Sequence, residues 1–175
     1  MIRIGIATAI ALAMTAVPAR AQAKVELGAS LANLTIGLGD NDFTTFGVPS
    51  SFFGLLNPSV YASIFATPRI SIDPKIGLVV LSGGGETDHV LSLGGQVNYF
   101  LKGTDVNSLY ILGDVGLVSI SDSDSTTSFG GGAGYRWLIG DRIAIRTEGR
   151  LTHHTDGGGN SLSFNLSMGG LFGKK

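Results

Sequence analysis

The chain has 175 residues, 27 glycines and no cysteine, and its formal net charge is −1. Without cysteine, neither disulfides nor thiolate metal sites can form. A charge so close to neutral lacks the basic footprint of a nucleic-acid-binding protein, so we expect no nucleic-acid partner.

The first 23 residues have the order of a secretory signal peptide. Arg3 precedes an apolar run from Ile4 to Val17, and Ala21-Gln22-Ala23 has the small-x-small pattern of a cleavage site. The run is too short for a membrane-spanning helix. We expect cleavage after Ala23 and one exported domain over residues 24–175, which keeps 10 basic and 13 acidic residues.

The rest of the chain alternates apolar and polar residues with a period of two, which is typical of β-strands with two different faces. The last segment is the clearest example: Leu162, Phe164 and Leu166 alternate with serine and asparagine. In chain order, we expect strands near residues 25–31, 59–67, 70–80, 91–101, 109–117, 128–139, 142–151 and 161–172. The pattern leaves open which way the side chains of residues 59–67 face.

The connections between these segments alternate in character. Tight turns are expected at Pro68-Arg69, Lys102 to Asn107 and Gly140-Asp141. The other connections are longer or more polar, at residues 39–58, 82–88, 121–127 and 155–160. An even number of strands, with short turns at one end and longer loops at the other, is the pattern of outer membrane barrels. The predicted fold is an all-β, eight-stranded, antiparallel, up-and-down transmembrane β-barrel.

Alternation alone also fits a soluble lipocalin-like carrier, which would turn its apolar face inward and its charges outward. The polar faces carry four acids and four bases, a balance that a narrow, charged interior would require. We therefore predict a lumen charge network of Glu26, Asp73, Lys75, Asp114, Arg136, Arg146, Glu148 and Arg150. Such a network could plug the barrel or form the constriction of a narrow pore, and we favour the plug because eight strands leave room only for side chains.

Aromatic residues gather beside the tight turns and the C-terminus, where their rings would suit a membrane–water interface. The predicted aromatic girdle comprises Tyr99, Phe100, Tyr110, Tyr135, Trp137 and Phe172. Charge is divided in the same direction. The loops hold acids and no lysine or arginine, whereas the turn end holds Arg69, Lys102, Arg142, Lys174 and Lys175 with only two acids. This division favours acidic loops outside the cell and a basic end in the periplasm.

Two consecutive segments resemble a known family. Residues 129–137, a glycine-rich strand ending in Tyr135-Arg136-Trp137, and residues 141–150, with Arg146, Glu148 and Arg150, resemble the penultimate hairpin of small outer membrane β-barrel proteins. The family is that of the OmpA-like and OmpX-like barrel domains. Its C-terminal assembly signal resembles the last strand, although here Gly173-Lys174-Lys175 follows the aromatic Phe172. The resemblance implies a barrel in the bacterial outer membrane and specifies no activity.

Two local motifs suggest further functions. His153-His154-Thr155-Asp156 weakly resembles the His-x-Ser corner of outer-membrane lipid A deacylases, but threonine replaces the serine and the last strand offers no acid to orient the histidine. Asp122, Asp124, Glu86 and Asp88 could bind Ca²⁺ or Mg²⁺, or bridge to lipopolysaccharide, although plain solubility explains them as well. The apolar first loop, with Phe43, Phe46, Phe52 and Phe53, has no settled role.

We therefore predict a monomeric integral outer membrane barrel with a structural or surface-interaction role. Its expected partners are outer membrane lipid, lipopolysaccharide and a surface ligand or protein bound through the loops. No catalytic residue, metal or cofactor is expected. The alternatives are an outer-leaflet lipid-modifying enzyme, a narrow porin and a soluble periplasmic carrier.

Overall fold

A computed structural model describes residues 24–38, 44–47, 60–83, 86–120, 125–155 and 159–173. The predicted signal peptide, most of the first loop, Asp122, Asp124, Asp156 and the last two lysines lie outside these residues. Among the described residues, no helix is long and apolar enough to cross a membrane.

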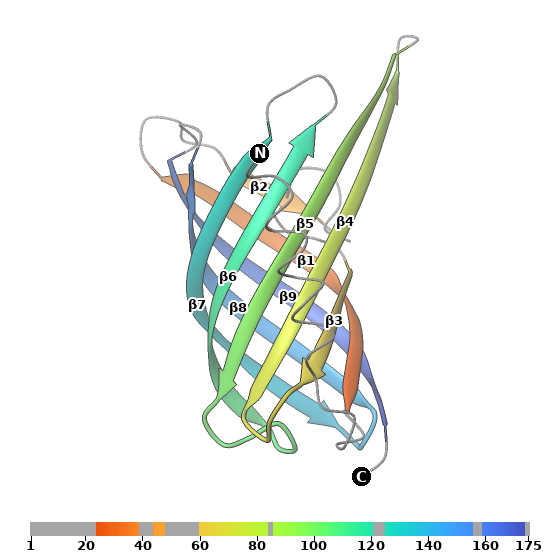
Figure 1. Cartoon of the computed structure of the whole chain (residues 1–175), viewed down its shortest axis with the longest axis vertical. Coiled ribbons are helices and arrows are strands. Elements are labelled where there is room, and N and C mark those ends of the chain that lie inside the picture. The colour runs from red at the N-terminus through yellow and green to blue at the C-terminus, as the bar shows by residue number, and fades with distance from the viewer. Residues whose placement is uncertain are drawn as a thin grey trace.

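The strands form one closed antiparallel sheet (Figure 1). In chain order they are β1 (Val25–Leu38), β2 (Thr44–Gly47), β3 (Val60–Phe65), β4 (Ile70–Gly83), β5 (Glu86–Phe100), β6 (Ser108–Ile120), β7 (Thr126–Ile139), β8 (Ile143–His154) and β9 (Asn160–Phe172). Neighbours in sequence pair throughout β3 to β9, and β9 pairs back with β1 along almost its whole length. The predicted up-and-down barrel is confirmed.

The second strand of the barrel is divided into two pieces. β2 pairs with Asn33–Ile36 of β1, and β3 pairs with Val25–Ala29 of the same strand. Both lie along the edge of β1 that does not pair with β9, and β3 continues the sheet to β4, so the barrel has eight strand positions. The prediction of a loop over residues 39–58 is therefore wrong for Thr44–Gly47. In the β3–β4 ladder the paired residues skip Pro74, which has no backbone N–H to donate.

Strand β1 contains an extra residue. Its pairing with β9 shifts between Ser30 and Ala32, which marks a β-bulge at Leu31. The bulge changes the facing of the residues that follow, so that Glu26 and Ser30 before it and Asn33 and Thr35 after it are all buried.

The β4–β5 hairpin is longer than predicted. Its ladder continues to the pair Gly83–Glu86, so the loop expected over residues 82–88 is mostly strand, and the hairpin rises above the other strands in Figure 1. The opposite end carries the three short connections, after β3, β5 and β7. We call this the turn end, and the other the loop end.

Inward-facing glycines make room for two long aromatic side chains. A Cβ atom at Gly134 would lie 2.5 Å from Cζ of Tyr110, and one at Gly28 would lie 2.3 Å from Cζ of Tyr61. Both tyrosine rings therefore lie against backbone that has no side chain, on a neighbouring strand.

This close approach predicts the effect of a substitution. Gly134→Val should lower the free energy of unfolding by about 1–3 kcal/mol, because the new side chain overlaps Tyr110 and the Thr147 carbonyl. Gly131→Val on the outward face of the same strand is the matched control, since its nearest contact would be 3.5 Å away. Urea midpoints of the refolded barrel measure both, and equal midpoints for the two variants would contradict the packing described here.

Candidate functional site

The barrel is inverted relative to a soluble protein. Its largest fully buried side chains include Arg136, Arg146, Gln96 and Glu26, whereas Phe164 and Leu151 on the outside are about half exposed. Leu166 and Met168 also face outward. This is the opposite of the arrangement that a lipocalin-like carrier requires.

The first part of the lumen charge network is centred on Arg146 of β8. Its Nε atom lies 2.7 Å from Oε1 of Glu26, and its Nη1 atom donates to Oδ2 of Asp73 at 2.8 Å. The Nη2 atom donates to the hydroxyl of Ser63 at 2.9 Å. Arg136 donates from Nε to Oε2 of Glu26, also at 2.9 Å. Two guanidinium groups and two carboxylates thus neutralise each other where almost no surface is exposed.

The second part lies nearer the loop end and is centred on Arg150. Its Nη1 atom donates to Oδ2 of Asp114 at 2.7 Å, and its Nη2 atom donates to Oε2 of Glu148 at 2.5 Å. Lys75 hydrogen-bonds to Gln96, and its Nζ atom lies 3.9 Å from Oε2 of Glu148. The structure thus places all eight predicted residues on the inner face and brings them into two contacting groups.

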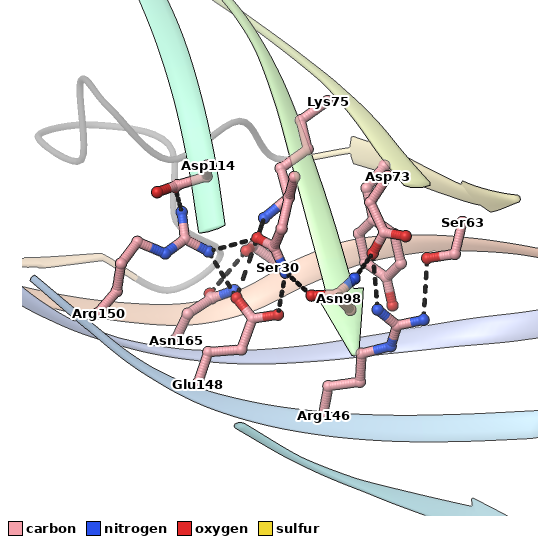
Figure 2. Close-up of polar contacts among 12 residues, drawn as sticks. Ser30, Ser63, Asp73, Lys75, Asn98, Asp114, Arg146, Glu148, Arg150 and Asn165 are labelled. Atoms are coloured by element: carbon pink, nitrogen blue, oxygen red, sulfur yellow. Dashed lines mark hydrogen bonds and ion pairs between the residues drawn. The ribbon is translucent and has the colours of Figure 1, made fainter. Parts of the chain in front are cut away.

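Neutral side chains outside the predicted lumen charge network connect its two parts (Figure 2). Gln96 donates to Oε1 of Glu148 at 3.0 Å and to Asn98, which in turn donates to Oδ2 of Asp73 at 2.8 Å. Tyr110 also donates to Oε1 of Glu148, at 2.8 Å. Because these residues alternate in step with the predicted charges, the period of two was the signal that could have identified them.

The interior narrows to an aromatic floor at the turn end. The floor consists of Phe65, Phe100 and Tyr110, with ring centroids 6.3 Å apart for the first pair and 5.0 Å for the second. The Arg136 guanidinium lies 5.2 Å from the centroid of Phe65, a cation–π distance. Phe100 and Tyr110 were predicted for the outer girdle, and that prediction is wrong: both are fully buried. Phe100 lies two residues after the inward Asn98, and Tyr110 lies two residues after the inward Ser108. Both aromatic side chains therefore share the inner face.

The remaining girdle residues do face outward. Tyr99, Trp137 and Phe172 are exposed, and Tyr135 packs against Trp137 with ring centroids 4.6 Å apart. All four lie in the parts of their strands near the turn end.

A turn below the floor covers the mouth of the barrel. Residues 101–107 between β5 and β6, which we call the cap turn, bring Thr104 inward, where its N–H donates to the Pro68 carbonyl at 2.9 Å. The Thr104 carbonyl accepts a hydrogen bond from Nη1 of Arg136 at 2.6 Å. Asp105 forms an ion pair with Lys24. The connection predicted at Lys102 to Asn107 is therefore bonded to three other parts of the barrel.

Little space remains among these interior side chains. Two small cavities adjoin Lys75, of about 20 Å³ beside Asp114 and about 10 Å³ beside Asp73. The first has the volume of roughly one water molecule. The cap turn, the aromatic floor and the buried side chains of the lumen charge network together fill the turn end and the middle of the described lumen.

The two histidines at the end of β8 face opposite sides. His153 is exposed, and its Nδ1 atom lies 2.9 Å from Oδ1 of Asn160, so an amide supplies the orienting group that the sequence analysis did not find. The hydroxyl of Thr155, however, donates to the Thr127 carbonyl. His154 is buried and lies 3.0 Å from the hydroxyl of Ser161. Within the described ranges, no three histidine, aspartate or glutamate side chains are placed to hold a metal ion.

The architecture is that of an outer membrane β-barrel: a closed antiparallel sheet with charge inside, apolar residues outside, and turns and loops at opposite ends. No protein-family model and no curated protein matches the sequence. The similarity found is to solved structures.

Solved structures with this fold include three outer membrane proteins. The N-terminal β-barrel domain of Pseudomonas aeruginosa OprF has a TM-score of 0.55 and 15% identity, covering 86% of this chain and 98% of that one. OprG, an outer membrane protein of the same organism, has a TM-score of 0.52 and 10% identity, covering 88% and 97%. Yersinia pestis Ail, the attachment invasion locus protein, has a TM-score of 0.50 and 12% identity, covering 87% and 100%. The chain thus has the fold of the small eight-stranded outer membrane barrels, as the sequence resemblance implied.

The lumen charge network predicts a large effect from removing one charge. Glu148→Gln should lower the free energy of unfolding by about 3–5 kcal/mol, because it leaves buried cations without their carboxylate. Asp105→Asn should change the free energy of unfolding by less than about 1 kcal/mol, because the Asp105 side chain is 67% exposed in its ion pair with Lys24. Denaturant midpoints of the two refolded variants test the difference, and an unchanged midpoint for Glu148→Gln would show that the network is not balanced as described.

Proposed function

We propose that this protein is an integral barrel of the bacterial outer membrane that reinforces the envelope and presents its loops for surface contacts. The observation that carries the proposal is the inverted distribution of side chains, with paired ions inside and apolar residues outside. Arg146 is 1% exposed, whereas Phe164 is 49% exposed. An apolar band of this kind is stable only where hydrocarbon surrounds it.

Three features support the orientation in that membrane. The outward girdle of Tyr99, Tyr135, Trp137 and Phe172 suits one interface. The basic residues of the turn end and the acidic residues of the loops suit a periplasmic turn end and an external loop end. The signal peptide expected over residues 1–23 would export the chain, with cleavage after Ala23.

The filled lumen supports a role that does not involve transport. The cap turn, the aromatic floor and both parts of the lumen charge network lie one after another along the axis. An ion crossing this path would have to displace buried, paired charges, at a cost of several kcal/mol for each pair broken.

The proposed role is also non-enzymatic, and the proposed partners are outer membrane lipid, lipopolysaccharide and a ligand or protein at the loops, with the barrel as a monomer. His153 and Asn160 form the one outward-facing pair in the described chain that resembles part of a catalytic site, and Thr155 donates its hydroxyl elsewhere. Hydrolysis of lipopolysaccharide acyl esters by the protein, abolished by His153→Ala, would overturn this part of the proposal.

The membrane assignment predicts the behaviour of the whole protein in cells. It should be recovered in the detergent-extracted outer membrane fraction and should migrate differently on gels before and after heating, because the closed barrel resists unfolding by detergent. A soluble periplasmic enzyme from the same cells serves as the fractionation control. Recovery of the chain with that enzyme would refute the assignment.

The closed lumen predicts electrical silence. The protein inserted in a planar bilayer should give no steady conductance, because the side chains of the lumen charge network fill the interior of the barrel. A steady conductance that changes on Arg146→Leu would show that ions pass the network and would favour the narrow porin instead.

A further inference from the structure

A crevice of about 1120 Å³ lies at the turn end, and the lumen charge network does not use it. The cap turn lines one part of it, the β7–β8 turn another, and the ends of β1 and β9 a third. Its surface combines charged and apolar side chains, among them Lys24, Lys102, Arg142, Leu138 and Leu171.

The crevice is held in shape by the bonds that fix the cap turn. The Asn107 side chain accepts a hydrogen bond from the Leu138 N–H at 2.7 Å, which joins the cap turn to the end of β7. The Leu171 N–H donates to the Arg142 carbonyl at 2.8 Å and joins β9 to the β7–β8 turn. These bonds fix several parts of the lining relative to one another without a ligand.

The charges of the crevice are only partly compensated. Lys24 is paired with Asp105. Among the described residues, neither Lys102 nor Arg142 lies within ion-pair distance of a carboxylate, and both are exposed. Asp141 is the other acid in the lining. Two cations from turns separated by strands β6 and β7 therefore face a common space without anionic partners.

Several lining residues continue inward-facing positions of the strands, whereas Phe172 in the same lining belongs to the outward girdle. Lys24 lies two residues before the inward Glu26, Arg142 two before the inward Ala144, and Leu138 two after the inward Arg136. Apolar and cationic groups are thus mixed within the crevice, at the turn end of the barrel.

We propose that this crevice binds a short acidic peptide segment of a periplasmic partner, with carboxylates at Lys102 and Arg142 and apolar side chains against Leu138 and Leu171. Because the two cations come from different turns of the same crevice, the proposed ligand is a chain with several carboxylates. The proposal rests on the proposed function, because only a barrel oriented with its turn end inward presents the crevice to the periplasm.

The test uses the full chain refolded in zwitterionic detergent micelles and a fluorescein-labelled hexapeptide of alternating glutamate and leucine. Fluorescence anisotropy should show saturable binding that weakens as salt rises from 0.1 M to 1 M, since screening shortens the range of the charges. The double variant Lys102→Gln/Arg142→Gln should lower the affinity by about tenfold. Arg69→Gln is the matched control, because Arg69 is an exposed cation of the same end that does not line the crevice, and its affinity should stay within about twofold.

Several results would overturn the proposal. These are the absence of saturable binding, equal losses for the double variant and Arg69→Gln, or equally tight binding of a lysine–leucine hexapeptide. A further outcome is that the protein retains phosphatidylglycerol and not the acidic peptide. If that retention depended on Lys102 and Arg142, the crevice would be a lipid site and the peptide proposal would be overturned. The heat-dependent gel shift of each sample reports the folded barrel separately, so a folded barrel that fails to bind refutes the crevice proposal and leaves the membrane assignment intact.

Discussion

The pairing of buried ions is the constraint on which the rest of this structure depends. A barrel of eight strands has no room to hydrate eight charged side chains, and an unpaired ion there costs several kcal/mol. Each carboxylate must therefore meet a cation within the width of the lumen. Glu26 on β1 contacts arginines from β7 and β8, and Asp73 on β4 contacts Arg146 across the barrel. These contacts tie strands that are far apart in the sheet, so the register of one strand constrains the others.

The same constraint explains where the glycines and tyrosines lie. Tyr61 and Tyr110 donate their hydroxyls to Glu26 and Glu148, one in each part of the lumen charge network. A ring can reach those carboxylates only by lying along the inner surface, and it does so against Gly28 or Gly134. In each part of the network, a glutamate, a tyrosine ring and a glycine form one packed unit: Glu26 with Tyr61 and Gly28, and Glu148 with Tyr110 and Gly134. A glycine-rich inner face is thus part of the electrostatic arrangement as well as of the packing.

The period of two predicts most of this barrel because every strand separates two very different environments. It gives the strand positions and the residues that share each face, and the balance of charge on the polar faces then indicates that those faces turn inward. It fails where the chain departs from regular pairing. The bulge at Leu31 appears in the sequence only as two adjacent apolar residues, and the split second strand interrupts the alternation with an apolar segment. For Phe100 and Tyr110 two sequence signals disagree: their position near the turns suggests the girdle, whereas their spacing of two residues from Asn98 and Ser108 indicates the inner face, where both lie. The position of the cap turn was predicted but its contacts could not be, because its bonds to Pro68, Arg136 and Lys24 join residues distant in sequence.

The two ends of the barrel are consequently different in kind. At the turn end, the hydrogen bond from Arg136 to the cap turn and the cation–π contacts of Arg136 close the interior, and the same guanidinium is ion-paired with Glu26. A lumen filled in this way confines any recognition to the surfaces beyond it. On the described chain, the exposed cations Lys102 and Arg142 are the charged groups of the crevice without a carboxylate partner, whereas the interior cations are all paired. A region whose charges are already balanced gains little from a ligand, and a region with unbalanced charge can gain more, which is the reason to propose binding at the turn-end crevice and not in the lumen.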